Sequence, residues 1–283
     1  MSQSSEPRKP SFLNEMISGY LGGAAYILSG QPLDIVKVRM QSTGETSIVQ
    51  SLKHIWKNEG ILAFWKGSFF PLTTVGISIA LLFGINEDLK HRYQKLLGKN
   101  SLDYIDLFFV GGSAGMMYAA FVCPVEHIKI RMQIQSDSAT TVYANSIDCF
   151  RKVYSEHGLR GLFKGLSPTL IREFLGCGGY FATYFYLKEK FKTDSKVMTM
   201  IYGGLSGIMA WNMTFWLDNY KSRIQSDNIS NPKYKGFKGF SNLSFRQLSK
   251  GYFAGMIKSF PSNAGTFLVY EIANKYLYGT NSK

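Results

Sequence analysis

Six long apolar segments run along the chain, and shorter polar segments separate them. Each apolar segment is long enough to form a helix that crosses a bilayer of about 30 Å with some tilt. The polar segments have the spacing of short amphipathic helices, for example over residues 47–60 and 146–158. The pattern predicts an all-α membrane protein with six tilted transmembrane helices, over residues 12–41, 68–97, 104–134, 166–192, 196–226 and 252–278.

One phrase in this pattern occurs three times. QPLDIVKVRMQ at residues 31–41 returns as CPVEHIKIRMQ at 123–133 and as FWLDNYKSRIQ at 215–225, with equal spacing between the copies. A Lys-Gly pair recurs after each copy, in WKG, FKG and SKG. Agreement of this kind over the whole chain indicates tandem repeats within one domain, residues 1–283. We place the repeats at 12–98, 104–193 and 196–279, after a flexible N-terminus at 1–11.

The repeats alone leave open a soluble helical repeat protein, but two features favour a membrane protein. Apolar runs such as ISIALLFGI are longer than a soluble solenoid needs. Two glycines, four residues apart, also precede each phrase and would let neighbouring helices approach closely in lipid. These pairs are Gly19 and Gly23, Gly111 and Gly115, and Gly203 and Gly207.

Composition narrows the classes of function. The mean hydropathy of −0.06 is too polar for helices that face lipid all round, but it suits helices that surround a polar cavity. The net charge of +13 is spread along the chain, so we expect no nucleic-acid partner. Neither a metal set, a nucleophile–base pair nor a phosphate loop is visible, so we expect no enzyme and no cofactor. The first residues resemble neither a secretory signal nor a transit peptide.

The repeated phrase places an acid and a base three residues apart, on one face of a helix. Both cannot face lipid, where an ionised group costs at least about 2.5–3.5 kcal/mol. A single copy would be read as a solvated surface contact, but three copies in register favour a ring of ion pairs between helices. The expected pairs are Asp34–Lys129, Glu126–Lys221 and Asp218–Lys37. These six residues are the ion-pair ring.

Other residues of the phrase would shape this ring. Pro32 and Pro124 each remove a backbone hydrogen bond, so we expect kinks that bend the helices toward one end of a cavity. Gln41, Gln133 and Gln225 lie two turns below the bases and are expected to brace the pairs. Such a ring would act as a gate, because its pairs can break and form again.

These residues resemble the signature of the mitochondrial carrier family, P-x-[DE]-x-x-[KR]-x-[KR] followed by an acid-Gly pair and an aromatic-basic-Gly triplet. The resemblance covers essentially the whole chain. The first repeat fits fully, with Glu59 before Gly60. The second departs only where His157 replaces the acid. The third departs more, with Trp216 for the proline, Leu243-Ser244 for acid-Gly and Ser249 for the aromatic residue.

The resemblance implies a six-helix barrel in the inner mitochondrial membrane, with both termini in the intermembrane space and short amphipathic helices on the matrix side. The ion-pair ring would be its matrix gate. The resemblance also implies bound cardiolipin beside the Lys-Gly turns, where helix N-termini and basic residues attract phosphate. The residues concerned are Lys66, Gly67, Lys164, Gly165, Lys250 and Gly251.

Substrate sites of the family lie seven residues past each of these glycines, which corresponds here to Thr74, Arg172 and Lys258. This depth is about 10 Å along the helix, too far for comfortable snorkelling to the interface. The Arg172-Glu173 pair and Trp211 are similar to the carnitine/acylcarnitine and basic amino-acid branch, although that branch usually has arginine in place of Lys258. We expect Glu173 to attract a substrate cation, while Arg172 and Lys258 hold its carboxylate.

A second gate, on the cytosolic side, is implied at [FY]-[DE]-x-x-[KR] positions. Phe185 replaces one acid and Asn274 one base, so this gate is thinner and we expect the matrix-closed state at rest. The residues that remain are Glu87, Lys90, Lys188 and Glu271.

Two hypotheses about function follow from these residues. The first is a monomeric carrier that exchanges a small amino-acid-like or carnitine-type solute by alternating access. The second is a carrier-fold structural subunit of a respiratory assembly, with reduced or no transport, motivated by the worn third signature. The sequence leaves the solute, strict exchange and proton-leak activity open.

Overall fold

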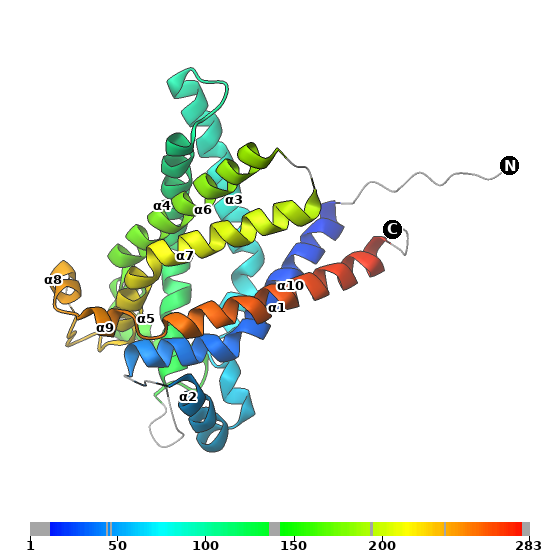
Figure 1. The fold of residues 1–283 in the computed structure, drawn as a ribbon. Helices are drawn as coiled ribbons and strands as arrows, with labels where there is room; N and C mark the ends of the chain where they lie inside the picture. Colours follow the sequence, from blue (N-terminus) through cyan, green and yellow to red (C-terminus); the bar gives the residue numbers. More distant parts are fainter. Residues whose placement is uncertain are drawn as a thin grey trace.

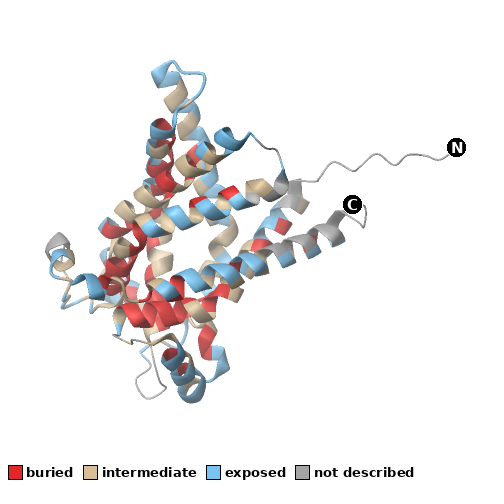
Figure 2. Ribbon diagram, viewed as in Figure 1, coloured by how far each residue is buried: buried red, intermediate tan, exposed pale blue. Residues whose placement is uncertain are grey.

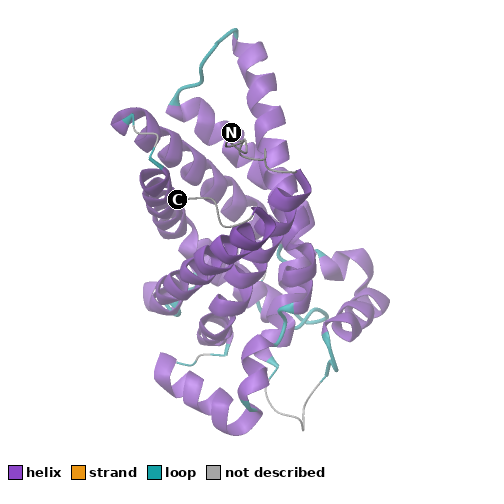
Figure 3. Cartoon of the chain, turned by 90° about the vertical axis from the view of Figure 1, so that its right-hand side faces the viewer, coloured by secondary structure: helices purple, strands orange, loops and turns teal. Residues whose placement is uncertain are grey.

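The computed structural model describes residues 12–43, 45, 47–135, 142–192, 195–234 and 236–278. The N-terminus predicted to be flexible, residues 1–11, lies outside this part. Within it, the chain consists of helices and loops, without a strand (Figure 3).

Six long helices form the body of the part of the chain that is described (Figure 1). Each matches a predicted helix, with boundaries that differ by at most one residue. They are α1 (Phe12–Ser42), α3 (Phe69–Leu97), α4 (Tyr104–Ile134), α6 (Leu166–Phe191), α7 (Lys196–Ser226) and α10 (Tyr252–Tyr278). The predicted all-α fold is confirmed, and the start of α1 and the end of α10 lie on the same side of the molecule (Figure 1).

Local signals explain where several of these helices begin and end. At the start of α4, the side chain of Asp103 accepts from the backbone N–H of Asp106, and the Asp106 side chain accepts from that of Asp103. This capping box satisfies two otherwise free donors. At the end of α3, Gly98 adopts the left-handed conformation with φ 63°, which favours glycine and stops the helix.

Shorter elements link the two long helices of each repeat, and we call these segments the linkers. The first linker contains α2 (Ile48–His54), the π-helical turn η1 (Ile55–Glu59) and the 3-10 helix η2 (Ile61–Trp65). The second is α5 (Ser146–Leu162), and the third contains α8 (Gly236–Ser241) and α9 (Phe245–Leu248). The helices predicted over 47–60 and 146–158 are therefore present.

Glycine divides the first two linkers. Gly60 ends the helical turn with φ 83°, and Gly158 interrupts α5 with φ 60°. Side chains with a Cβ avoid this region of backbone conformation, so glycine sets both bends.

Buried residues gather where the C-terminal halves of α1, α4 and α7 meet (Figure 2). The linkers pack onto these halves. Ile35 and Val36 of α1 contact an apolar cluster with Ile55 and Phe64 of the first linker. Ile128 and Met132 of α4 do the same with Cys149, Val153 and Leu162 of α5. The linkers thus complete the core at one end of the molecule.

Large apolar side chains remain exposed along the outer faces of the long helices, for example Ile77, Phe83, Phe109, Phe253 and Phe260. Two helical stretches, Ile61–Leu97 and Tyr104–Ile134, are long and apolar enough by composition to cross a membrane. The charged residues that the repeated phrase contributes to α1 and α7, including Asp34, Lys37, Asp218 and Lys221, are buried.

The glycine pairs do not behave alike. A Cβ at Gly111 would lie 3.0 Å from the Cys177 carbonyl oxygen, and one at Gly23 would lie 2.7 Å from Val75. A Cβ at Gly115 would lie still closer to the backbone carbonyl of Glu173. In the third repeat, by contrast, no described atom lies within 4 Å of such a Cβ at Gly207. Close backbone approach is therefore confirmed for Gly111 and Gly115, and it is wrong for Gly19 and Gly207, where no described atom lies within 4 Å of an added Cβ.

Candidate functional site

The three predicted ion pairs are present where α1, α4 and α7 converge. Lys37 Nζ lies 2.6 Å from Asp218 Oδ2, and Lys221 Nζ lies 2.6 Å from Glu126 Oε2. Lys129 contacts Asp34 directly. Each pair joins two different helices, and none of the six side chains is more than 23% exposed. The ion-pair ring is thus closed and largely dehydrated.

Two cations predicted to bind substrate join this ring instead of standing apart from it. Arg172 of α6 places one guanidinium nitrogen 3.0 Å from both carboxylate oxygens of Glu126, and another 3.5 Å from Asp218. It also contacts Glu173, the acid that follows it. Lys258 of α10 lies with its Nζ 2.6 Å from Asp34 Oδ1. The sequence predicted both residues as substrate-binding and gave no sign of these contacts with the ring acids.

Trp211 contacts the ion-pair ring, whereas Thr74 forms a hydrogen bond within its own helix. Lys37 Nζ lies 4.5 Å from the centroid of the Trp211 ring, so the indole covers the ring lysine on one side through a cation–π contact. The indole packs against Gly255, and its buried Nε1 has no hydrogen-bond partner among the described residues. The Thr74 hydroxyl donates to the Phe70 carbonyl of its own helix at 2.7 Å. Thr74 therefore does not join the charged cluster.

The glutamines brace the ring at one position only. Gln133 Nε2 donates to Asp34 Oδ2 at 3.3 Å, as predicted. Gln225 instead donates to the Lys164 carbonyl at 3.2 Å, and the Gln41 amide has no hydrogen-bond partner among the described residues. The prediction is wrong for Gln41 and Gln225, because both side chains pack against the Lys-Gly turns rather than upward on the ring.

The prolines lie inside continuous helices, Pro32 in α1 and Pro124 in α4, two residues before the ring acids. Trp216 has the corresponding place in α7 and packs on Phe245 of the third linker, with 4.9 Å between ring centroids. The proline kinks stay predictions. In the third repeat an aromatic contact with the linker takes the place of the proline.

The residues predicted for the second gate form no ring among the described side chains. Glu87 and Lys90 pair within α3 at 3.5 Å. Lys90 also lies 5.4 Å from the ring of Phe185, the residue that replaces an acid. Lys188 is exposed and has no ion pair with any described side chain, while the side chain of Glu271 lies outside the described residues. This end of the molecule is therefore not locked by charge in the part that is described.

The Lys-Gly turns fit tightly against neighbouring helices. Gly67, Gly165 and Gly251 adopt φ of 81°, 81° and 80°. A Cβ would lie 2.7 Å from the Lys129 carbonyl oxygen at Gly67, 3.0 Å from Gln225 at Gly165 and 3.1 Å from the Lys37 carbonyl oxygen at Gly251. Each turn thus needs glycine for two reasons, its backbone conformation and the space available.

The lysines of these turns are held by the protein. Lys66 Nζ lies 2.5 Å from Glu59, and Lys164 donates to the carbonyls of Asp227 and Asn228 at 2.7 Å. Burial, together with the charge of Arg131, lowers the pKa of Lys164 to about 8. An anion placed beside Lys164 would stabilise the charged form of this lysine.

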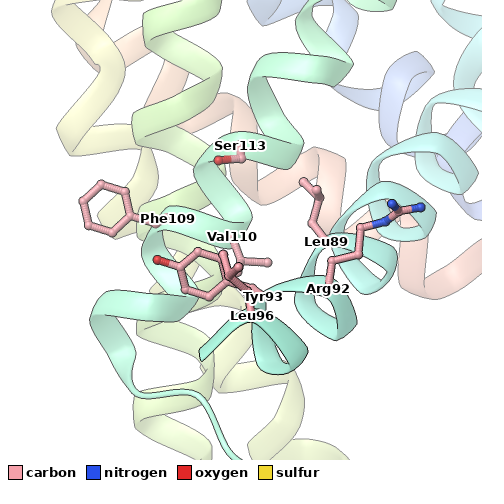
Figure 4. A pocket seen from close by; sticks show the side chains of 7 residues that line it. All are labelled: Leu89, Arg92, Tyr93, Leu96, Phe109, Val110 and Ser113. Carbon is pink, nitrogen blue, oxygen red and sulfur yellow. The ribbon is translucent and has the colours of Figure 1, made fainter. Parts of the chain in front are cut away.

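Hollows lie beside two of the turns. One of about 710 Å³ is lined by Arg160, Lys164 and Gly165 with apolar residues of α6 and α7. Another of about 590 Å³ is lined by Arg246, Lys250 and Gly251. A third, of about 310 Å³, lies between the ends of α3 and α4 farthest from the ion-pair ring (Figure 4). None of the predicted site residues lines that third hollow, which contains Leu89, Arg92, Tyr93, Leu96, Phe109, Val110 and Ser113.

Comparison with known proteins places this site in a family. The model of the mitochondrial carrier protein family matches residues 8–97, 100–195 and 192–281. The mouse mitochondrial carnitine/acylcarnitine carrier protein is 32% identical over 96% of this chain and 97% of its own length. The mitochondrial glycine transporter YMC1 of Saccharomyces cerevisiae is 31% identical over 94% of this chain and 92% of its own length. The human mitochondrial basic amino acids transporter is also 31% identical, over 94% and 91%. With all three repeats matched and relatives aligned along nearly their whole length, the chain belongs to the mitochondrial carrier protein family.

Proposed function

We propose that this protein exchanges a small amino-acid-like or carnitine-type carboxylate across the inner mitochondrial membrane by alternating access, with both termini in the intermembrane space. One observation carries the proposal. Arg172 and Lys258, which lie at the family's substrate positions, are ion-paired to Glu126 and Asp34 of the ion-pair ring. A substrate carboxylate that binds these cations must compete with the acids of the matrix gate.

This competition would couple binding to opening. In the closed ring, Glu126 holds both Lys221 and Arg172, and Asp34 holds both Lys129 and Lys258. When a substrate carboxylate takes over Arg172 and Lys258, each acid keeps one partner instead of two. The ring then loses part of the attraction that compensates its dehydration, and the three helix ends can separate.

Glu173 supplies the complementary charge. Its carboxylate contacts Arg172 and lies 3.6 Å from the thiol of Cys177. A negative charge therefore lies directly beside the arginine, where a substrate cation could pair with it. A substrate ammonium or trimethylammonium group would pair with Glu173 while its carboxylate pairs with Arg172. The relatives named for glycine, carnitine esters and basic amino acids all act on solutes with both groups, which supports this class.

The state of the two gates also supports alternating access. The ion-pair ring is closed, whereas at the other end Glu87 and Lys90 pair within their own helix and with no other described helix. A cavity open toward the intermembrane space and sealed toward the matrix is one of the two states that such a carrier requires.

We further propose that the hollows beside Lys164-Gly165 and Lys250-Gly251 bind cardiolipin. Each combines basic side chains and the N-terminus of a long helix with apolar walls. A doubly charged phosphate headgroup with acyl chains matches that combination.

Exchange in proteoliposomes tests the proposed transport. Vesicles loaded with glycine, carnitine, arginine or glutamate would be assayed for uptake of the same labelled solute. We expect exchange of at least one of them by the wild type and its loss in Arg172→Ala. Arg92→Ala is the matched control, because Arg92 is exposed and, among the described side chains, its ion pair is with Asp88 of its own helix. Lys258→Arg should keep exchange, whereas Lys258→Met should not.

Two results would contradict the proposal. One is exchange by Arg172→Ala at the wild-type rate. The other is absence of exchange for every solute by a folded wild type that co-purifies with a respiratory complex, which would support the structural-subunit hypothesis instead.

A further inference from the structure

A second layer of contacts lies directly below the ion-pair ring and is built around three arginines. Arg39, Arg131 and Arg223 each follow a ring lysine by two residues. Arg39 donates to the carbonyls of Gln133 and Gln135 at the end of α4, at 3.0 and 3.4 Å. Cations at helix C-termini are favourable because carbonyls and the helix dipole point there. Arg39 therefore ties α1 to α4.

The other two arginines make related contacts. Arg131 donates to the carbonyl of Asp227, which follows α7, at 2.8 Å, and so ties α4 to α7. Arg223 donates to the carbonyl of Gln247 in α9 at 3.0 Å, so it ties α7 to its own linker. An arginine side chain is flexible and its guanidinium has several donors, so a further contact is needed to fix its orientation.

In the first repeat, an acid of the linker aims the arginine. Glu59 binds Arg39 through both oxygens, at 2.5 and 3.0 Å, and also pairs with Lys66. The corresponding positions of the other linkers hold His157 and Leu243, which offer no carboxylate. Arg131 and Arg223 need a different acceptor.

The structure supplies that acceptor from the long helix itself, four residues before the arginine. In the second repeat, His127 Nε2 accepts from Arg131 Nε at 2.8 Å. An arginine can only donate, so the proton of this imidazole is on Nδ1, which lies 3.2 Å from the Leu162 carbonyl at the end of α5. His127 thus joins Arg131 to the linker.

Asn219 makes the same two-sided contact in the third repeat. Its Oδ1 accepts from Arg223 Nε at 2.8 Å, and its Nδ2 donates to the carbonyl of Lys250 at 3.0 Å. The equivalent residue of the first repeat is Ile35, which packs in an apolar cluster beside the Glu59 linker. All three positions are completely buried, so a polar side chain there needs both contacts.

We propose that His127 and Asn219 are positioning residues that replace Glu59 in the second and third repeats, aiming the arginine clamp and docking the linker on its helix. In these two repeats an acceptor on the long helix takes the role of the linker acid, so the loss of the acid is compensated. The proposal concerns the matrix end of the fold and does not depend on which solute is transported.

The second repeat allows the exchange to be tested with three variants. His127→Leu removes both contacts. His127→Asn copies the third repeat. His127→Leu combined with His157→Glu copies the first repeat, and the backbone permits it because Gly60 and Gly158 both follow these positions at positive φ. We expect His127→Leu to lower the thermal unfolding midpoint by about 5 °C, and the other two variants to recover most of that loss.

A local readout separates positioning from general packing. Cys149 of α5 is fully buried against α4, and burial raises the pKa of its thiol to about 12. In a background with Cys123→Ala and Cys177→Ala, maleimide should label Cys149 about tenfold faster in His127→Leu, because α5 undocks more often. His127→Asn and the double variant should return the rate to that of the background. Ile35→Leu, at the equivalent site of the first repeat, should leave it unchanged.

The proposal fails if His127→Asn is as unstable and as reactive as His127→Leu and if His157→Glu brings no recovery. Should His127→Leu not yield folded protein, recovery of folded protein on adding His157→Glu supports the proposal. Failure of both that double variant and His127→Asn to fold overturns it.

Discussion

Glu59 illustrates how one side chain sets the electrostatics of a linker. Its carboxylate is 1% exposed and lies between Arg39 and Lys66. Burial by itself raises the pKa of this carboxyl, but hydrogen bonds and charges from Arg39 and Lys66 outweigh it and leave the pKa below its ordinary 4.5. A carboxyl with a depressed pKa stabilises the fold above its unfolded pKa, and this stabilisation is lost as the pH falls through the folded pKa.

The first prediction follows from the direction of this pH dependence. Glu59→Gln should lower the free energy of unfolding by about 2 kcal/mol at neutral pH, because Arg39 and Lys66 lose their counter-charge. The difference from wild type should shrink as the pH is lowered below the ordinary pKa of 4.5, where the native carboxyl also becomes protonated. Thermal unfolding of purified protein at several pH values measures both. Glu156→Gln, 66% exposed, is the control and should have no effect. A difference that persists unchanged in acid would contradict this account.

At the scale of elements, glycines decide how the long helices and linkers meet. The Lys-Gly turns combine positive φ with close contact to a neighbouring helix. Other glycines have only one of these features or neither. Gly98 has φ 63° but open space around it, and Gly19 is helical with no neighbour within 4 Å. The chain thus contains its own controls for the two effects.

Alanine substitutions at these positions should rank in a fixed order. Gly67→Ala should cost about 2–3 kcal/mol of stability, because strain at positive φ adds to the clash with the Lys129 carbonyl. Gly98→Ala should cost about 1 kcal/mol from strain alone, and Gly19→Ala should cost nothing or stabilise slightly. Thermal unfolding midpoints of the three variants provide the measurement. Equal losses at Gly67 and Gly98 would show that contact with α4 contributes nothing.

At the scale of the whole molecule, the two ends differ in charge pairing. The ion-pair ring closes one end with buried pairs between helices. At the other end, Lys90 pairs with Glu87 of its own helix at 3.5 Å and lies 5.4 Å from the ring of Phe185, where the signature has an acid. A cation–π contact at a partly exposed site contributes about 0.5–1 kcal/mol, less than a well-formed ion pair between helices. This imbalance favours the state in which the ion-pair ring is closed.

Restoring the acid should shift that balance. Phe185→Asp would give Lys90 and Lys188 a carboxylate, and each 1.4 kcal/mol gained by the cytosol-closed state changes the ratio of the two states about tenfold. In a variant with Thr74→Cys and without native cysteines, an impermeant thiol reagent added on the cytosolic side should then label more slowly. Phe185→Asn, similar in size to Asp but uncharged, is the matched control. Equal labelling of the Asp and Asn variants would refute a role for charge at this end.

Much of the architecture could be predicted because it depends on local and repeated features. The length of each apolar segment determines a helix wherever its neighbours lie, so all six helices were placed within one residue. The ring pairs Asp34–Lys129 and Asp218–Lys37 followed from a symmetry argument, since three equivalent helices that each carry one acid and one base can satisfy every charge only between neighbours. Both inferences need the order of residues but no coordinates.

Other contacts depended on distances between helices that no repeat specifies. Arg172 and Lys258 are on α6 and α10, and only the packing of those helices on α4 and α1 brings their side chains to Glu126 and Asp34. The Gln225 side chain packs against the turn at Gly165, and there it donates to the Lys164 carbonyl. The aligned repeats do carry a signal for His127, because a polar residue stands four positions before the arginine in the two repeats whose linkers lack the acid. The contact between His127 and Arg131 itself is seen only in the structure.

The sequence by itself therefore determined the six helices, their threefold repetition and the three interlocking charge pairs, because chain-local hydrophobicity and symmetry suffice for them. Only the tertiary structure decided which buried acceptor each arginine, lysine and glutamine found. A dehydrated polar group takes the nearest partner that satisfies its geometry, and distances of a few ångströms between helices select that partner.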